Sequence, residues 1–184
     1  ARHGSYETRR DILFVGNFNH LPNRDAVWWF VQEIFPRIRE ALPDVTFKIV
    51  GSHMPDDIAS ISAPGVEPIG WVHDLVPLYH SVRVVVAPLR YGAGIKGKLG
   101  ESAAHGVPFV CTSIATEGTF MEHERDCLNA DTATDFSDQV VRLYRDQALW
   151  ETLSRNVQSA IERQCSPAVA AERFRELFSL LNVW

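Results

Sequence analysis

A short stretch in the middle of the chain combines three glycines with three basic residues, RYGAGIKGK at residues 90–98. Gly92 and Gly94 allow positive φ angles and a close approach of the backbone to a ligand. The residues that follow indicate a helix, whose first free N–H groups would point back toward the loop. Lys96 and Lys98 in its first turn would each destabilise the helix by about 0.3–1 kcal/mol, because a cation is unfavourable at the positive end of the helix dipole. A bound anion would make the two positive charges favourable. We therefore predict a diphosphate or sugar-phosphate site.

A structural role for the same residues is an open alternative. The lysines can point into solvent, and Lys98 can pair with Glu101 for about 0.2–0.5 kcal/mol. Stricter phosphate-binding motifs are missing, because the chain has no GxxxxGK[ST] and its segment GNFNHLPN (residues 16–23) is not GxGxxG. The sequence therefore gives poor support to a nucleoside triphosphatase or a simple NAD enzyme.

The composition is that of an ordinary soluble globular domain. The 184 residues are 46% hydrophobic and 22% charged, with a net charge of −5 and a pI near 5.8. An acidic chain argues against broad nucleic-acid binding. No apolar run reaches the ~18 residues of a membrane span, and no signal peptide is recognisable. We therefore expect a cytoplasmic protein with no transmembrane segment.

The three cysteines, Cys111, Cys127 and Cys165, are odd in number and widely spaced. This pattern indicates neither a disulfide framework nor a zinc site. Cys111 lies within an apolar segment, so we expect it to be buried and inert. Such cysteine usage fits a reducing cytoplasm. The chain begins at Ala1 without a methionine, so we expect either a fragment or a trimmed form of a longer protein.

Short apolar segments alternate with helical patterns along the chain. We expect strands at residues 12–16, 45–51, 66–72, 82–89, 108–113 and 127–131, and helices at 25–42, 55–62, 74–81, 135–145, 148–164 and 167–181. Residues 1–10 are polar and aperiodic and are interpreted as a leader or linker. The pattern predicts one α/β domain over residues 11–184, a Rossmann-like, doubly wound parallel sheet of about six strands with helices on both faces.

Local signals refine this prediction. Pro36 should kink the first helix because it has no N–H group, and Pro68 should confine its strand to an edge of the sheet. Asp74 is a candidate N-cap for the helix that follows it. The last helix has an apolar stripe at helical spacing, formed by Phe174, Leu177, Phe178 and Leu181.

The residues that follow each strand are the best candidates for a ligand site, because ligands bind outside the carboxyl ends of parallel strands. In chain order they are residues 16–17, 51–52, 71–73, 90–94 and 113–118. His73 and His80 have no acidic or cysteine partner at metal-ligand spacing, and no serine lies in a GxSxG motif. We therefore predict neither a metal site nor a catalytic serine.

Five segments of the chain, in this order and spacing, resemble a known family. They are similar to the C-terminal, nucleotide-sugar-binding domain of the retaining glycosyltransferases of family four, which have the two-domain GT-B fold. The segments are ILFVGNFNHLPNRDAVWWF, FKIVG, IGWVHDLVPLY, VVVAPLRYGAGIKGK and GESAAHGVPFVCTS. The resemblance covers about residues 11–180 and looks closest to the branch found in surface-polysaccharide and O-antigen assembly.

The resemblance implies roles for the glycine loop and the helix after it. Glu101 matches the second glutamate of the family's E-x7-E motif, which holds the ribose hydroxyls of the donor. The loop whose backbone contacts the donor sugar and phosphate is matched by Gly92, Ala93, Gly94 and Ile95. These residues are therefore expected to bind the donor.

Two further segments carry over from the family. Trp71 and Val72 match the segment that brackets the base through main-chain contacts. Glu117 and Gly118 match a segment that lies near the donor after the fifth strand. We expect all four residues to belong to the donor site.

The sequence departs from the family pattern at two places. The first glutamate of E-x7-E, which hydrogen-bonds the donor sugar in the family, is replaced here by Ala93. The basic pair after the first strand is also changed, because Asn17 replaces the arginine after Gly16, and only Arg24 lies near the expected lysine. Our hypothesis is that the two lysines of the glycine loop take over part of the diphosphate neutralisation.

These observations predict the donor-binding domain of a retaining hexosyl- or glycosyltransferase that acts on a polysaccharide or glycoconjugate acceptor. The resemblance implies a UDP- or GDP-linked sugar as donor, and an N-terminal acceptor domain of roughly 150–200 residues that precedes this one in the whole enzyme. We expect this chain alone to bind nucleotide weakly and to transfer no sugar. No metal, other cofactor or nucleic acid is expected, and any membrane contact would be peripheral, through the full-length enzyme.

Two other functions stay open. The alanine in place of the first glutamate favours a catalytically retired binding or scaffold domain of the same fold. A nucleotide-sugar epimerase or a phosphorylase built from the same half-domain would need acid–base groups at the cleft, for which His105 and Glu117 are mild candidates. No catalytic residue is assigned from the sequence.

Overall fold

The computed structural model describes residues 4–92, 94, 97–165 and 167–180. Within these residues, six strands form one parallel sheet in the order β3-β2-β1-β4-β5-β6. They are β1 (Arg10–Val15), β2 (Phe47–Val50), β3 (Val66–Gly70), β4 (Val82–Ala87), β5 (Phe109–Cys111) and β6 (Leu128–Asn129). The strand order reverses between β1 and β4, which confirms the predicted doubly wound, Rossmann-like fold.

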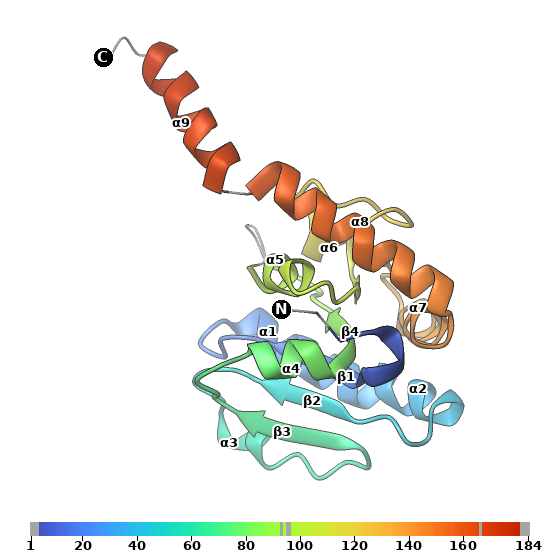
Figure 1. Cartoon of the computed structure of the whole chain (residues 1–184). Helices are drawn as coiled ribbons and strands as arrows, with labels where there is room; N and C mark the ends of the chain where they lie inside the picture. Colours follow the sequence, from blue (N-terminus) through green and yellow to red (C-terminus); the bar gives the residue numbers. More distant parts are fainter. Residues whose placement is uncertain (1–3, 93, 95–96, 166, 181–184) are drawn as a thin grey trace.

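Helices pack on both faces of the sheet, with α1 and α2 behind it and α4 in front in the view of Figure 1. On one side η2 and α2 contact α7, and on the other α5 contacts α8. The described helices are η1 (Tyr6–Thr8), α1 (Leu21–Trp29), the π-helical turn η2 (Phe30–Ile34), α2 (Phe35–Ala41), α3 (Asp56–Ala59), α4 (Val76–Ser81), α5 (Gly97–Ala104), α6 (Ser113–Thr116), α7 (Ala133–Arg145), α8 (Gln147–Cys165) and α9 (Pro167–Leu180).

The middle of the sheet is buried because these helices cover both of its faces. Ile12, Leu13 and Phe14 of β1 are fully buried, and every residue of β4 is buried as well. Burial on both faces explains why the two strands read as nearly continuous apolar runs. Each buried aliphatic or aromatic side chain contributes about 1.5–3 kcal/mol. The central strands therefore form a rigid base for the loops at their ends.

The first long helix begins four residues earlier than predicted. The apolar pattern predicts a start at Asp25, but α1 starts at Leu21. Pro22 lies in the first turn, where its missing N–H group is not needed for an intrahelical hydrogen bond. Farther along, η2 interrupts the α-helical hydrogen bonds just before Pro36, which lies in the first turn of α2. The expected disruption is therefore present, in the form of a π-helical turn.

Two other local predictions concern Pro68 and Asp74. The strand that contains Pro68, β3, lies at the edge of the sheet, as predicted, and its register with β2 is irregular. Asp74 Oδ1 accepts a 2.9 Å hydrogen bond from the backbone N–H of Val76. Leu75, however, is the N-cap of α4. Asp74 therefore lies one residue outside the predicted cap position and forms an Asx-type turn.

Residues 4–10 are part of the fold, so the prediction of a leader is wrong for them. The Tyr6 ring packs edge-to-face on Trp150 of α8, with 5.9 Å between ring centres. Arg9 is fully buried. Its guanidinium donates to four main-chain oxygens, those of Gly4 (2.8 Å), His105 (3.1 Å), Val82 (3.2 Å) and Tyr79. Because the last three of these partners lie 70 to 96 residues away, the sequence pattern around Arg9 does not reveal them.

The last helix leaves its apolar stripe exposed. In Figure 1, α9 extends beyond the body of the domain. Phe174, Leu177 and Phe178 are 60%, 48% and 37% exposed, and the two phenylalanine rings stack with 6.3 Å between their centres. Leu181 lies outside the described residues. The sequence pattern thus identified an amphipathic helix but did not predict that its apolar face would be open.

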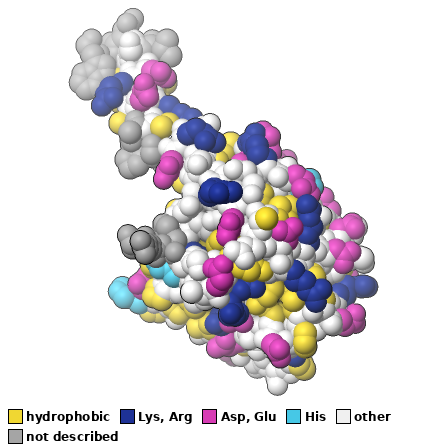
Figure 2. Space-filling model, turned by 45° about the vertical axis from the view of Figure 1, so that its right-hand side comes forward, with side chains coloured by type: hydrophobic (Ala, Val, Ile, Leu, Met, Phe, Trp, Pro, Cys, Tyr) yellow, Lys and Arg dark blue, Asp and Glu magenta, His cyan; other side chains and the backbone are white. Residues whose placement is uncertain are grey.

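The surface carries charges of both signs. Figure 2 shows acidic and basic side chains interspersed over the face that it presents, with apolar groups between them. Such a mixed surface is typical of solvated charges spread over a globular domain. Of the helices in the described part of the chain, none is long and apolar enough to cross a membrane.

Candidate functional site

A cavity of about 330 Å³ opens at the carboxyl edge of the sheet, between the ends of β1, β2 and β3 and the start of α5. Its described lining consists of Val15, Gly16, Asn17, Val50, Gly51, Ser52, Trp71, Val72, Leu75, Gly97, Lys98 and Glu101. The structure therefore brings together six of the residues predicted from the sequence to bind a donor, namely Gly16, Asn17, Trp71, Val72, Lys98 and Glu101.

Two larger cavities lie elsewhere. One of 440 Å³ is at the amino edge of the sheet, next to Arg10, Arg83 and Tyr144, and one of 450 Å³ lies between α2 and α7. The described lining of neither one includes a residue that follows a strand at the carboxyl edge. Because ligands of doubly wound sheets bind where the strand order reverses, the smaller cavity is the candidate site.

Two glycines allow the ends of β1 and β2 to approach each other closely. A Cβ atom on Gly51 would lie 1.7 Å from the carbonyl oxygen of Gly16, so a larger residue does not fit there. A Cβ atom on Gly16 would lie 2.9 Å from Phe14 Cε1 and 3.0 Å from Asn23 Cγ. This wall of the cavity is therefore formed by backbone, which permits a ligand to approach it closely.

Lys98 places a positive charge on the opposite wall. Its Nζ donates a 2.6 Å hydrogen bond to Asn23 Oδ1 and lies 4.2 Å from the centre of the Phe14 ring. Lys98 occupies the first turn of α5, where the helix dipole disfavours a cation by about 0.3–1 kcal/mol. The backbone N–H groups at the start of α5 add partial positive charge there. This wall is therefore suited to an anion.

Glu101 lies one turn farther along α5 and is held by Tyr79. The Tyr79 hydroxyl donates a 3.1 Å hydrogen bond to Glu101 Oε2, and Tyr79 itself is 1% exposed. Burial first, and then the negative charge of Glu101 and the hydrogen bond to it, raise the pKa of Tyr79 far above its usual value. Tyr79 therefore stays protonated near neutral pH and orients a carboxylate that can accept hydrogen bonds from a ligand.

Trp71 forms an aromatic rim at the mouth of the cavity. Its side chain is 67% exposed and its ring centre lies 6.1 Å from that of His73. Trp71 follows Gly70, whose φ of +82° turns the chain at the end of the edge strand. An exposed indole beside a cavity provides a flat apolar surface on which a ring can stack.

Other residues predicted for the site lie outside the cavity. Arg24 is on the surface of α1, where its guanidinium pairs with Asp57 at 3.2 Å. In the part of the chain that the structure describes, four predicted residues are exposed but do not line the cavity, namely Gly92, Gly94, Glu117 and Gly118. Three more lie outside the described residues, namely Ala93, Ile95 and Lys96.

Sequence reasoning missed Asn23 and Tyr79, the residues that hold Lys98 and Glu101. Asn23 precedes the predicted start of the first helix at Asp25, although Pro22 before it is a signal for the first turn of a helix. Tyr79 fits the apolar pattern of its helix and has no motif around it. Both residues act through contacts with segments 75 and 22 residues away, and a local pattern does not show such contacts.

The acid–base candidates of the epimerase alternative do not meet at the cavity. His105 follows the far end of α5, where its carbonyl oxygen accepts a hydrogen bond from Arg9 and its ring stacks on Tyr79 with 5.0 Å between ring centres. Glu117 is exposed, and neither residue is part of the described cavity lining. Within the described residues, no group of three or more histidine, cysteine, aspartate or glutamate side chains could hold a metal ion.

A doubly wound parallel sheet with a cavity at its carboxyl edge defines a Rossmann-like fold. Comparison with known families makes this class more specific. The profile of the family Glycosyl transferases group 1 matches residues 9–146. The chain therefore belongs to the Glycosyl transferases group 1 family.

Solved structures place the fold among GT-B glycosyltransferases. A variant of S. aureus TarM, in complex with Fondaparinux, alpha-GlcNAc-glycerol and UDP, matches with a TM-score of 0.77 and 15% identity over 97% of this chain and 36% of its own. The C-terminal domain of the glycosyl transferase group 1 protein LpcC from Francisella tularensis matches with a TM-score of 0.68 and 13% identity, over 88% of this chain and 89% of that domain. The fold is thus like that of the C-terminal domain of a GT-B enzyme.

A curated relative matches over most of this chain. An uncharacterized 44.6 kDa protein in the cps region of Klebsiella pneumoniae is 23% identical over 182 residues, which cover 90% of this chain and 45% of the relative. The chain therefore spans about half the length of that protein.

Proposed function

We propose that this chain is the donor-binding domain of a glycosyltransferase and that a UDP-linked sugar occupies the cavity at the carboxyl edge. The observation that carries the proposal is the meeting of Lys98, the first turn of α5 and Glu101 at one cavity. An ammonium group and the N–H groups of the first turn of a helix suit a diphosphate, and a carboxylate suits the hydroxyl groups of a ribose. The TarM variant that shares this fold was solved with UDP, which supports this choice of nucleotide.

The domain would contribute to transfer by holding the donor and stabilising the leaving diphosphate. As the bond between the anomeric carbon and the diphosphate oxygen breaks, negative charge develops on that oxygen. Lys98 and the α5 N–H groups would stabilise this charge, and Glu101, oriented by Tyr79, would fix the ribose and with it the position of the diphosphate. In accordance with the family resemblance, we propose that transfer retains the anomeric configuration.

A second domain would supply the acceptor site. The chain corresponds to 45% of the K. pneumoniae relative, and we propose that the remainder of the whole enzyme includes the acceptor-binding domain. The cps-region name of that relative supports a polysaccharide or glycoconjugate as acceptor. On this proposal the chain alone binds nucleotide but transfers no sugar.

Calorimetric titration with UDP tests the proposal. The chain should bind UDP, and Lys98→Met should weaken binding about ten-fold or more because it removes a charge-assisted hydrogen bond to the diphosphate. Lys48→Met is the matched control, since Lys48 pairs with Asp11 at 2.9 Å and does not line the described cavity. The proposal fails if millimolar UDP gives no binding, or if the two variants bind UDP equally well.

A catalytically retired binding domain is the second candidate, and Ala93 favours it. The resemblance places at this position a glutamate that contacts the donor sugar, and alanine cannot replace its hydrogen bonds. Release of UDP from a UDP-linked sugar by the whole protein separates the two candidates. Turnover with an acceptor supports the transferase, whereas UDP binding without any turnover supports the retired domain.

A further inference from the structure

Glu101 and His105 lie one helical turn apart, and both side chains contact Tyr79 of α4. The backbone N–H of His105 donates a 3.2 Å hydrogen bond to the carbonyl oxygen of Glu101, which continues the helical pattern of α5 past Ala104. The Tyr79 hydroxyl donates to Glu101 Oε2 at 3.1 Å, and the Tyr79 ring stacks on the ring of His105 at an angle of 11°. One tyrosine therefore connects the end of α5 with the candidate site.

The ring stack limits the movement of Tyr79. Tyr79 is 1% exposed, and on the other ring of the stack, His105, the ring of His80 packs edge-to-face with 5.5 Å between centres. Aromatic pairs favour defined ring geometries, so the imidazole of His105 restricts how far the tyrosine can tilt. Because the hydroxyl lies at the end of the ring, a tilt would carry it away from Glu101 Oε2.

The carboxylate of Glu101 needs such support because it lies on the surface. Glu101 is exposed, and it lines the cavity at the carboxyl edge. A long exposed side chain samples several rotamers, and fixing it in one of them costs conformational entropy. A hydrogen bond from a buried and fixed hydroxyl favours one rotamer before a ligand arrives. A carboxylate accepts through both of its oxygens, so Oε1 can still accept a hydrogen bond from a ligand.

We propose that His105 is a positioning residue of the donor site, which acts through Tyr79 to hold Glu101 against the ribose and so makes the site prefer ribose to deoxyribose. The inference rests on the proposed function, in which Glu101 binds the ribose hydroxyl groups. A site that supplies a fixed acceptor for a hydroxyl group discriminates against a ligand without that group. It gives His105 a role although this residue does not line the described cavity.

Calorimetric titration with UDP and with 2′,3′-dideoxy-UDP, which lacks both ribose hydroxyl groups, tests the inference. The wild-type chain should prefer UDP by about ten-fold or more, because hydrogen bonds to a charged group are lost with the analogue. His105→Leu, which removes the ring, should lower this preference about three- to ten-fold and change the affinity for dideoxy-UDP by less than about two-fold. His105→Phe, which keeps a flat ring against Tyr79, should retain the preference within about two-fold of wild type.

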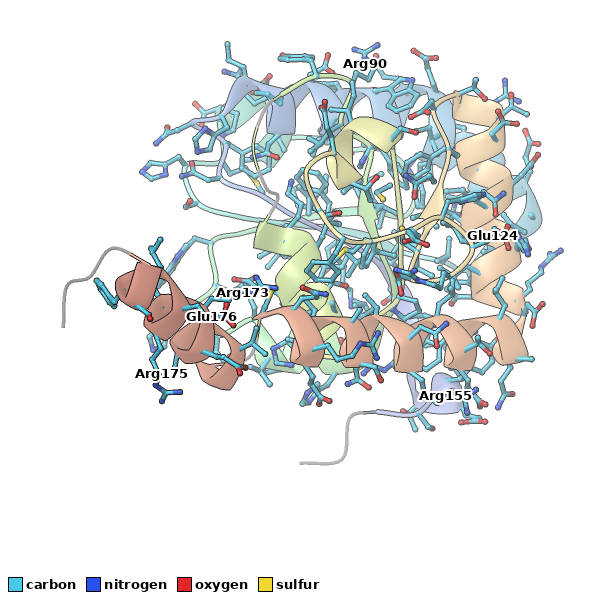
Figure 3. All side chains as sticks on the ribbon, turned by 90° about the horizontal axis from the view of Figure 1, so that it is seen from above. Arg90, Glu124, Arg155, Arg173, Arg175 and Glu176 are labelled. Atoms are coloured by element: carbon cyan, nitrogen blue, oxygen red, sulfur yellow. The ribbon has the colours of Figure 1, made fainter. Side chains whose placement is uncertain are left out.

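A Tyr79→Phe background shows whether the effect passes through the tyrosine hydroxyl. Tyr79→Phe should itself lower the preference for UDP, and His105→Leu should then lower it by less than about two-fold more. His123→Leu is the matched control, because His123 Nε2 lies 3.8 Å from Glu124, which Figure 3 shows beside α7, and His123 does not line the described cavity. It should leave both affinities unchanged, and urea unfolding checks that each variant is folded.

Several outcomes would overturn the inference. Equal losses of UDP and dideoxy-UDP affinity in His105→Leu would show a general structural role. A preference for UDP that His105→Leu leaves unchanged, or that falls as far in the Tyr79→Phe background as in wild type, would exclude action through Tyr79. The same preference in His105→Phe and His105→Leu would show that the ring does not matter. A wild-type chain that binds UDP and dideoxy-UDP equally well would also overturn it, whereas a chain that binds no UDP would overturn the proposed function itself.

Discussion

The two edges of the sheet use their basic side chains in opposite ways. At the amino edge Arg9 is fully buried, and Arg83 lies between the rings of Tyr6 and Tyr144, 4.0 and 4.5 Å from their centres. Both guanidinium groups donate to main-chain oxygens, so their donors hold distant segments together. Burial lowers the pKa of Arg9 to about 10. Cations at this edge therefore serve the fold.

At the carboxyl edge the cavity wall is glycine backbone, and a basic side chain lies across the cavity from it. Gly16 and Gly51 bring the strand ends together, and Lys98 donates a hydrogen bond to Asn23. The comparison teaches that the edge of the sheet at which a basic residue lies, and not its charge alone, indicates a ligand site. It also predicts that substitutions at the two edges separate stability from binding.

Arg9→Met should have the largest effect. It leaves several buried carbonyl oxygens without a donor, and each unsatisfied acceptor costs about 1–3 kcal/mol, so we expect the free energy of unfolding to fall by about 3–5 kcal/mol. UDP affinity of the folded protein should not change. Urea unfolding and calorimetry measure the two quantities. Arg10→Met, at an exposed site, should cost under about 1 kcal/mol. Equal costs for the two variants would show that burial of Arg9 does not matter.

Gly51→Ala changes a residue that lines the cavity at the carboxyl edge. Unlike the other substitutions, it should lower both the free energy of unfolding and the affinity for UDP. Its Cβ would meet the Gly16 oxygen at 1.7 Å, so the ends of β1 and β2 must move apart. We expect a loss of about 1–3 kcal/mol in the free energy of unfolding, as for other overpacked sites, together with weaker UDP binding. Gly100→Ala on α5 is the control, since its Cβ would find ordinary contact at 4.0 Å. Normal stability and UDP affinity in Gly51→Ala would contradict the close approach.

Trp71→Ala should affect binding only. Stacking of a base on an aromatic side chain contributes about 1–3 kcal/mol, so UDP affinity should fall about 5- to 150-fold. Binding of pyrophosphate, which has no base, should stay the same, in contrast to Lys98→Met, which should weaken both ligands. Phe174→Ala on α9, with a similar exposure of 60%, is the control. A parallel loss of UDP and pyrophosphate binding would show that Trp71 does not contact the base.

Tyr79→Phe should have the smallest effect at neutral pH, about 1 kcal/mol in the free energy of unfolding, because one hydrogen bond to Glu101 is lost. The folded-state pKa of Tyr79 is raised above its usual 10.0, so the unfolded chain releases this proton first as pH rises. The stability that Tyr79 contributes is fully present below pH 10.0 and is lost above it, at up to about 1.4 kcal/mol per pH unit.

Unfolding curves of wild type and Tyr79→Phe at several alkaline pH values measure how the stability that Tyr79 contributes depends on pH. The difference in their free energies of unfolding should shrink as pH rises above 10.0. A constant difference would mean that Tyr79 titrates equally in the folded and unfolded chains.

The fold and much of the candidate site followed from the sequence because both depend on periodic burial. Apolar runs such as 12–15 and 82–87 identified central strands, and parallel strands bring their carboxyl ends to one edge. For that reason Gly16, Trp71 and Lys98 were placed at the cavity without knowledge of any contact.

What sequence reasoning could not supply are the contacts that single polar side chains make across the fold. Arg24 looked available for a phosphate, yet the structure pairs it with Asp57 of α3. Asn23 had no motif around it, and its hydrogen bond to Lys98 spans 75 residues. Three of the four partners of Arg9 lie 70 to 96 residues away. Such contacts depend on geometry that no local pattern encodes.

Because the three cysteines differ in burial, a dye on one of them can measure the motion of the last helix in solution. Cys111 and Cys127 are buried, and Cys165 is exposed; burial, and then the hydrogen bond with Cys127, raise the pKa of Cys111. Because only an accessible thiolate reacts readily, a maleimide dye should label the natural chain at one position. That position is the last residue of α8, just before α9, so its fluorescence anisotropy would report how freely the exposed helix moves.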